Sequence, residues 1–162
     1  MKGYILKDKD KVVSLDTAMG LSAISVYVNM PKHSYVLQDD GSYILMKTED
    51  VDKSSRMIPA VTVGDMYNSL CDLYEYKVNG ATIYSMTESK EMDHIRVYTC
   101  VIDKFMDDYV VSYLDQDMEP MDNPMETTGK TEEEAIINMI SKVFCKNEIV
   151  KELNLEEDER VF

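Results

Sequence analysis

Alternating apolar and polar positions predict β-strands over much of the second half of the chain. The strand-like runs cover residues 74–78, 81–86, 94–103 and 109–114. Asn79-Gly80 separates the first two runs and tolerates the positive φ angles of a two-residue type I′ turn, so these runs form a hairpin. Asp107-Asp108 marks a corner between the last two runs. We therefore expect a meander of four consecutive antiparallel strands.

The first 60 residues contain one further hairpin signal. Residues 33–38 and 42–47 are rich in apolar and aromatic residues and flank the turn sequence Asp39-Asp40-Gly41. The stretch before them is ambiguous, because its apolar positions suit a helix over residues 15–23 and a strand over residues 24–28. The pattern thus predicts an N-terminal hairpin and leaves the earlier stretch open.

Two helices are predicted from capping residues followed by apolar periodicity. Thr62, with an acid three residues on, can cap a helix near residues 63–73. Thr131 with Glu134 forms a capping box for a longer helix near residues 132–146, whose three leading Glu residues favour the helix dipole. Its apolar stripe comprises Ala135, Ile136, Met139, Ile140, Val143 and Phe144. We therefore expect an α+β fold, in which both helices pack on an antiparallel sheet.

Length and composition bound the organisation of the chain. Its 162 residues, 44% of them apolar, are near the size of one domain and can bury a core. We expect a single domain over residues 1–155 and a frayed acidic tail over residues 156–162. Cys71, Cys100 and Cys145 are odd in number and widely spaced, which predicts reduced, half-buried thiols rather than disulfides or a zinc site.

No apolar run approaches the roughly 20 residues of a membrane span. The N-terminus becomes charged before a signal peptide could form. We therefore expect a cytoplasmic protein that does not bind a membrane.

Negative charge is concentrated in the second part of the chain, and the formal net charge is −14. Residues 1–60 contain eight Lys and Arg against eight Asp and Glu, whereas residues 61–162 contain nine against 23. Residues 103–134 alone contain eleven acids and two Lys. A pI near 4.4 without a basic cluster argues against direct binding to nucleic acid, because that affinity comes largely from Lys and Arg on phosphates.

Most of these acids lie on or beside a predicted long loop over residues 115–130, which contains two Pro and no periodicity. Glu132–Glu134 are explained by their favourable interaction with the dipole at the start of the helix. The acids left to explain are Asp107, Asp108, Asp115, Asp117, Glu119, Asp122 and Glu126. Neighbouring Met side chains, such as Met118, offer thioethers that adapt to varied partners. We expect these seven acids to form a binding face for a protein with a basic surface.

Two motifs in this region are similar to ligand-binding loops. Residues 115–126 place acidic or amide oxygens at loop positions 1, 3, 5, 9 and 12, as a calcium loop does, but Pro120 stands where that loop needs Gly. Gly129-Lys130-Thr131 is similar to the end of a phosphate-binding loop, yet it follows a loop instead of a strand. Thr131 is explained as a helix cap. We expect neither a metal nor a cofactor, with an acidic calcium loop as the alternative.

The sequence carries no catalytic motif. It contains no Gly-x-Ser-x-Gly and no Cys with His signature. His33 and His94 are isolated, and a single His beside an apolar strand is more often structural than catalytic. We expect a protein that is not an enzyme. The alternative is a small enzyme in which the fold brings one of these His residues to two carboxylates.

Four segments between residues 58 and 145 share their pattern with a known group of proteins. They are Ile58-Pro-Ala-Val-Thr-Val-Gly-Asp-Met, Val78-Asn-Gly, Tyr109-Val-Val-Ser-Tyr and Gly129-Lys-Thr-Glu-Glu-Glu-Ala-Ile-Ile-Asn-Met-Ile. In these segments the chain resembles small phage and prophage proteins of unknown function from gut bacteria. The shared motifs are helix caps and a turn, so the resemblance bears on fold and transfers no functional residue.

Together, the acidic segment, the missing catalytic motif and this resemblance lead to one functional hypothesis. The chain is an accessory protein of a phage or mobile element that binds a host or phage protein in the bacterial cytoplasm. In a sharper version, its acidic face imitates nucleic-acid phosphates and inhibits a host nucleic-acid-binding or defence enzyme.

Overall fold

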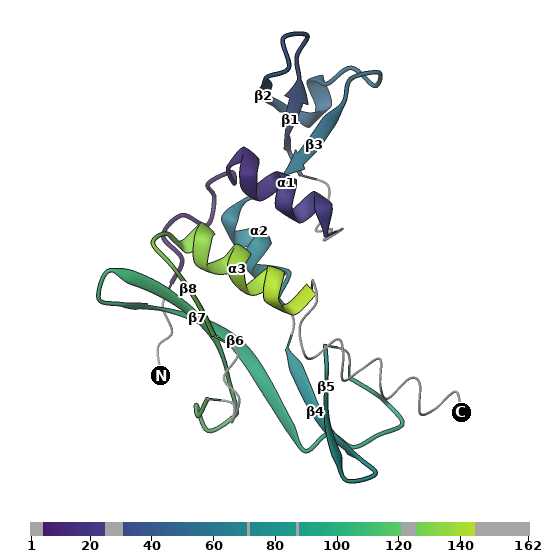
Figure 1. The fold of residues 1–162 in the computed structure, drawn as a ribbon, viewed down its shortest axis with the longest axis vertical. Helices are drawn as coiled ribbons and strands as arrows, with labels where there is room; N and C mark the ends of the chain where they lie inside the picture. The colour runs from purple at the N-terminus through teal and green to yellow at the C-terminus, as the bar shows by residue number, and fades with distance from the viewer. Residues whose placement is uncertain (1–4, 25–30, 71, 87, 121–125, 145–162) are drawn as a thin grey trace. The chain divides into compact units, whose positions relative to one another are not determined.

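The computed structural model describes residues 5–24, 31–70, 72–86, 88–120 and 126–144 (Figure 1). The chain divides into two compact units, one formed by Ile5–Ser69 and one that begins at Leu70. We call them the N-terminal unit and the C-terminal unit. Each contains one antiparallel sheet together with helix, which confirms the expected α+β class. The expectation of a single domain over residues 1–155 stays a prediction.

The N-terminal unit is built on a three-stranded sheet of order β2-β1-β3. Its strands are β1 (His33–Leu37), β2 (Tyr43–Lys47) and β3 (Met57–Ala60), and the 3-10 helix η1 (Thr48–Asp50) follows β2. β1 and β2 form the predicted hairpin. Asp40 accepts hydrogen bonds from the hydroxyl and the backbone N–H of Ser42 in the turn, and these bonds lower the pKa of its carboxyl. β3 was not predicted because it contains Pro59, which an edge strand accommodates.

Two helices complete the N-terminal unit. α1 (Leu15–Ala23) begins at Ser14, whose hydroxyl accepts a hydrogen bond from the N–H of Thr17 at 3.3 Å. The ambiguous stretch is therefore helical up to Ala23, and residues 25–28 lie outside the described residues. α2 (Val63–Asn68) begins at the predicted cap, where the Thr62 hydroxyl accepts from the N–H of Asp65 at 3.1 Å.

α2 is shorter than predicted. The helix ends at Asn68, and the hydroxyl of Ser69 donates to the carbonyl oxygen of Met66 at 2.6 Å. Leu73, which we expected on this helix, instead begins a strand and is fully buried. Pairing of that segment with strands on both sides outweighs its local helical periodicity.

The C-terminal unit contains a five-stranded antiparallel sheet of order β5-β4-β6-β7-β8. Its strands are β4 (Leu73–Val78), β5 (Ala81–Ser85), β6 (Arg96–Phe105), β7 (Asp108–Leu114) and β8 (Glu126–Gly129). β4 and β5 form the predicted hairpin, and Asn79 and Gly80 have φ angles of 51° and 83°. The expected meander is wrong in one pairing, because β6 pairs with β4 and not with β5.

The connection between β5 and β6 explains this order. It covers residues 86–95 and is too long for a tight turn. Within it, the backbone N–H of Ser89 donates to the Tyr76 hydroxyl at 2.6 Å. The His94 ring contacts the rings of Tyr74 and Tyr76 edge-on, with centroids 5.4 and 6.4 Å apart. The connection therefore packs on one face of β4, whose Tyr76 is buried, and brings β6 to the other edge of that strand.

β8 is a second correction, because residues 126–129 pair with β7 where we expected a loop. After it, α3 (Glu132–Phe144) begins at the predicted cap. The N–H of Glu134 donates to the Thr131 hydroxyl at 3.1 Å, and the Glu134 carboxylate accepts from the N–H of Lys130 at 3.2 Å. The predicted stripe is fully buried at Ala135, Ile136, Met139, Ile140 and Val143. The predicted end at residue 146 lies outside the described residues.

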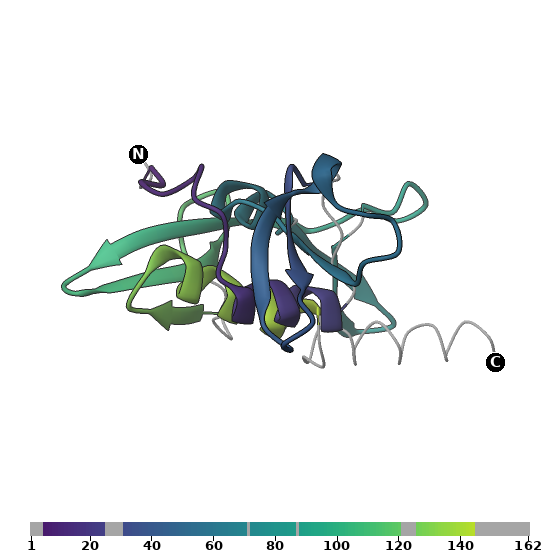
Figure 2. The ribbon, with the colours of Figure 1, turned by 90° about the horizontal axis from the view of Figure 1, so that it is seen from above.

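Gly129 brings β8 unusually close to α3. Figure 2 shows the chain passing from β8, in green, into α3, in yellow-green. A Cβ atom at this position would lie 2.4 Å from the backbone nitrogen of Ala135 and 2.9 Å from the carbonyl carbon of Glu134. The Thr127 hydroxyl donates to the carbonyl oxygen of Ala135 at 3.0 Å, which adds a direct strand-to-helix bond. The helix start is therefore fixed against the strand backbone.

Two further predictions can be compared with the described residues. Cys100 is a half-buried thiol, as predicted, and burial followed by the charge of Asp72 raises its pKa to about 12. Cys71 and Cys145 lie outside the described residues. In the part of the chain that the structure describes, no helix has the length and apolar composition of a membrane span.

Candidate functional site

The seven acids predicted as one binding face lie in separate places. The turn group is Asp107, between β6 and β7, together with Asp108, the first residue of β7. The loop group is Asp115, Asp117 and Glu119, after β7. The seven residues of β7 separate the two groups by about 20 Å. Glu126 begins β8 opposite Ser112, on the side of the loop group. Asp122 lies outside the described residues.

Asp115 organises the loop group. Its carboxylate accepts hydrogen bonds from the backbone N–H groups of Asp117 at 2.9 Å and Glu119 at 3.0 Å. Its own N–H donates to the Glu119 carbonyl at 2.8 Å, and Leu114 forms a bridge with Pro120 that closes the loop. The carboxylate of Asp115 therefore has a structural task, whereas the side chains of Asp117 and Glu119 are exposed to solvent.

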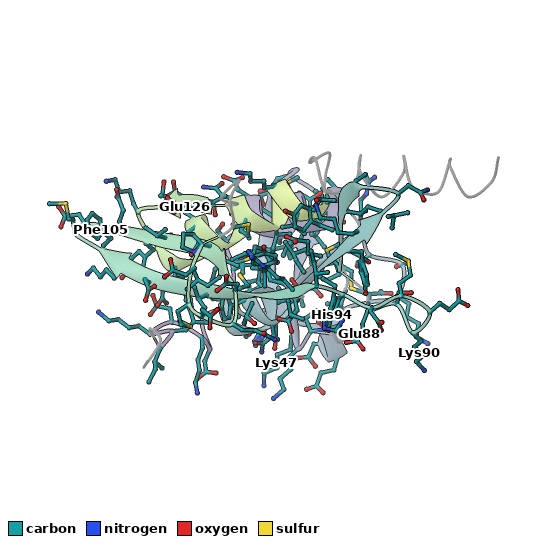
Figure 3. The ribbon with its side chains drawn as sticks, turned by 90° about the horizontal axis from the view of Figure 1, so that it is seen from below. Lys47, Glu88, Lys90, His94, Phe105 and Glu126 are labelled. Carbon is teal, nitrogen blue, oxygen red and sulfur yellow. The ribbon has the colours of Figure 1, made fainter. Side chains whose placement is uncertain are left out.

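The turn group lies beside two exposed apolar side chains. Phe105 is 67% exposed and Met106 is 83% exposed. Figure 3 shows Phe105 at the tip of the β6–β7 hairpin, pointing away from the rest of the C-terminal unit. Asp108 forms an ion pair with Lys130 at 2.5 Å, which raises the pKa of that Lys. Asp107 is the acid of this group that faces solvent.

The connections before and after β7 each contain a Met with an unusual backbone conformation. The φ angle is 56° at Met106 and 64° at Met118, whose side chain is 43% exposed. Residues other than Gly, Asn and Asp rarely adopt this left-handed region. Sequence reasoning noted Met118 beside its acids but missed Phe105 and Met106. The signal for these two residues was an apolar pair directly before the Asp107-Asp108 corner.

A buried carboxylate on β4 was also missed. Glu75 is 8% exposed and accepts a hydrogen bond from the Tyr98 hydroxyl of β6 at 2.8 Å. Its cross-strand partner is Arg96. Burial and then the hydrogen bond to Glu75 raise the pKa of Tyr98. The signal was a Glu opposite an Arg, but it depends on the β4–β6 pairing, which the expected strand order excluded.

Arg96 connects this buried cluster with the loop group. Its pKa is raised, first by the hydrogen bond and charge of Tyr98, then by the charges of Glu75 and Asp115. A pocket of about 220 Å³ lies here, lined by Ile95, Arg96, Val97, Asp115, Gln116 and Asp117. We interpret the cluster as structural, because a buried carboxylate is costly without hydrogen-bonding partners.

The surroundings of the two His residues do not favour acid–base catalysis. His33 lines a pocket of about 530 Å³ together with Pro31, Lys32, Lys47, Thr48 and Glu49. That pocket combines one His with one carboxylate and two Lys, not with two carboxylates. His94 is exposed and packs its ring against the two Tyr side chains of β4. The small-enzyme alternative gains no support from these arrangements.

Both ligand-loop motifs have structural explanations. Asp115, the first position of the calcium-like run, directs its carboxylate to two backbone N–H groups. Among the described residues, which leave out 121–125, no three His, Cys, Asp or Glu side chains form a metal-binding group. In Gly129-Lys130-Thr131, Gly129 allows close packing, Lys130 pairs with Asp108 and Thr131 caps α3.

The two units differ in charge. Ile5–Ser69 contains seven Lys and Arg against nine Asp and Glu. The described residues from Leu70 to Phe144 contain six against fifteen, a net of −9.

Comparisons with family models, with curated proteins and with solved structures find no match to this chain.

Proposed function

We propose that this protein binds another protein that has a basic surface, through the two ends of β7 in its C-terminal unit. One observation carries the proposal. Each end of β7 combines an exposed Met in the left-handed backbone region with exposed acids, Asp107 at the turn and Asp117 and Glu119 at the loop.

The cost of this arrangement supports a role in binding. A left-handed backbone at a residue other than Gly or Asn costs on the order of 1 kcal/mol, and such strain concentrates at functional sites. The exposed side chains of Phe105 and Met106 add apolar surface, which does not contribute to solubility. Flexible thioethers repack against varied partners, and nearby acids steer a basic partner into contact.

Within this proposal, the protein is an accessory factor of a phage or mobile element that acts in the bacterial cytoplasm. Its basic partner is a nucleic-acid-binding or defence enzyme, whose phosphate-binding surface the acids occupy by charge mimicry. The excess of fifteen acids over six basic residues in the described C-terminal unit supports this choice. It also opposes direct contact with nucleic acid.

The test uses three matched sets of substitutions in the whole chain, each tagged for capture from bacterial lysate. The turn set is Phe105→Ser, Met106→Gly and Asp107→Asn. The loop set is Asp117→Asn, Met118→Gly and Glu119→Gln. The control set is Glu88→Gln, Glu91→Gln and Asp93→Asn, which neutralises three exposed acids of the β5–β6 connection. All three sets leave Asp115 and its loop hydrogen bonds intact.

We expect the wild-type chain to capture a protein, and we expect less of it to be recovered at about 0.5 M salt than at about 0.1 M, because salt screens the charge pairs. The turn and loop sets should lose it, and the control set should retain it. Added duplex DNA or RNA should displace the captured protein if the acids occupy a phosphate-binding surface. Recovery that survives both sets, or falls equally with the control set, would refute β7 as the binding site.

A further inference from the structure

The two edges of the three-stranded sheet in the N-terminal unit differ in how they are protected. On the β3 edge, Pro59 has no N–H to offer a further strand. The carbonyl of Val61 beyond it already accepts the N–H of Val13 at 3.0 Å, and Val12 bridges to Thr62. Among the described residues, β2 forms the other edge, and its five residues contain no Pro. An open strand edge of this kind favours pairing with another strand.

The hydrogen-bond register shows which backbone groups of β2 face outward. The N–H of Gln38 donates to Ser42, and the N–H of Thr48 donates to Lys32, one at each end of the β1–β2 ladder. Hydrogen bonding alternates along an antiparallel pair. The groups of Ile44 and Met46 therefore face β1. Those of Tyr43, Leu45 and Lys47 face away from it.

Two adjacent apolar side chains of β2 are exposed. Ile44 is 45% exposed and Leu45 is 44% exposed, one on each face of the strand. Lys47 at the end of the strand is its only charged residue. Native edge strands are usually protected by short length, charged side chains such as Lys, bulges or Pro. β2 is short and ends in Lys47, but its central residues Ile44, Leu45 and Met46 include no charge and no Pro.

We propose that β2 pairs with β2 of a second copy of this chain, antiparallel and centred on Leu45, to make a six-stranded sheet. In this register Leu45 pairs with Leu45 of the second copy, Ile44 with its Met46, and Tyr43 with its Lys47. Every apolar residue meets an apolar residue, and each Lys meets a Tyr ring. The outward groups of Tyr43, Leu45 and Lys47 form the hydrogen-bonded pairs.

Charge opposes a second copy less at this edge than at an edge of the C-terminal unit. The N-terminal unit has a net charge of −2, whereas the described C-terminal unit has −9, so like units repel far less through the former. Beyond β2 the chain turns away at Gly41 and into η1, which limits pairing to five residues. We therefore expect a weak dimer, with Kd on the order of 10–100 μM.

Sedimentation of the whole chain, from about 5 μM to about 1 mM, tests this dimer. Leu45→Lys places like charges opposite each other at the centre and should raise Kd at least about tenfold. Met57→Lys is the control, because Met57 is 42% exposed on the protected β3 edge. Far-UV circular dichroism confirms that both variants fold. Wild type that remains monomeric at about 1 mM, or a Leu45→Lys chain that dimerises as wild type does, would overturn the proposal.

A cross-linking variant checks the register independently. Hydrogen-bonded residues in an antiparallel pair have Cα atoms about 5.5 Å apart, a distance that a disulfide spans. Leu45→Cys should therefore form a covalent dimer under mild oxidation, above the background that wild type gives through its own thiols. Met57→Cys should not. Equal cross-linking of the two variants would refute pairing at β2.

Discussion

Replacement of Gly129 by Ala should destabilise the C-terminal unit strongly. The added Cβ would lie 2.4 Å from the Ala135 nitrogen and 2.9 Å from both the carbonyl carbon and Cβ of Glu134. Ordinary contact begins near 3.4 Å, so β8 and α3 must separate by about 1 Å. Two of these three atoms belong to the backbone, and a change of rotamer cannot move them.

The magnitude follows from what that separation disturbs. Overpacking a tight contact costs about 1–3 kcal/mol. The shift also strains the Thr131 cap and the bond from Thr127 to Ala135, and a lost cap costs about 1 kcal/mol. Ala also restricts the unfolded chain more than Gly does, which offsets the loss by stabilising the folded state by about 0.4–1 kcal/mol. We expect a net loss of about 2–3 kcal/mol, or roughly 4–12 °C in Tm for a chain of this size.

Urea and thermal unfolding followed by circular dichroism measure this loss, and hydrogen exchange assigns it to β8 and α3. Gly20→Ala in α1 is the control, because a Cβ there meets nothing within 4 Å. It should stabilise the protein by about 0.5–1 kcal/mol, the usual difference between Ala and Gly in a helix. A Gly129→Ala chain within about 0.5 kcal/mol of wild type would show that strand and helix do not pack as described.

Four further predictions concern backbone strain and buried groups. Met106→Gly and Met118→Gly should each raise the free energy of unfolding by about 1 kcal/mol, because glycine relieves the positive φ; a lower Tm in both would contradict the strain. Tyr98→Phe removes the donor to buried Glu75 and should cost about 1–3 kcal/mol in urea unfolding, while no change would mean that solvent reaches the carboxylate. Because the pKa of Tyr98 is raised in the folded state, the neutral phenol of Tyr98 stabilises the fold fully below about pH 10, and this stabilisation is lost as the pH rises further. In the Glu75→Gln variant, ultraviolet titration should show the pKa of Tyr98 closer to its ordinary value. The pKa of about 12 predicts that Cys100 resists iodoacetamide at about pH 8 until urea unfolds the chain, and peptide mapping that finds it alkylated in the native protein would refute its burial.

The sequence predicted those elements whose signals are local. Asn79-Gly80 needs only its own two φ angles to specify a hairpin, and Thr131 with Glu134 needs only the first turn of a helix. Both are found where the sequence placed them. The end of α2 was wrong because Leu73 belongs to a strand whose stability comes from neighbours far along the chain.

The candidate site depended even more on distant contacts. Asp107 and Asp115 are close in sequence, yet a seven-residue strand places them at opposite ends of β7. Glu75 was missed because its partners, Arg96 and Tyr98, meet it only once β6 has passed β5 and paired with β4. The concentration of acids could therefore be predicted from the sequence. Their division into two separate groups could be seen only once the order and lengths of the strands were known.

The order β5-β4-β6-β7-β8 has a mechanical consequence. The β4–β5 hairpin and the β6–β7 hairpin are each closed by a short turn, but only three residue pairs join one to the other, at Leu73, Tyr74 and Glu75. This three-pair seam is the shortest ladder in the sheet, and the Glu75–Tyr98 hydrogen bond spans it. Under mechanical force or during partial unfolding, we expect the β4–β6 ladder to break first, which leaves the two hairpins intact.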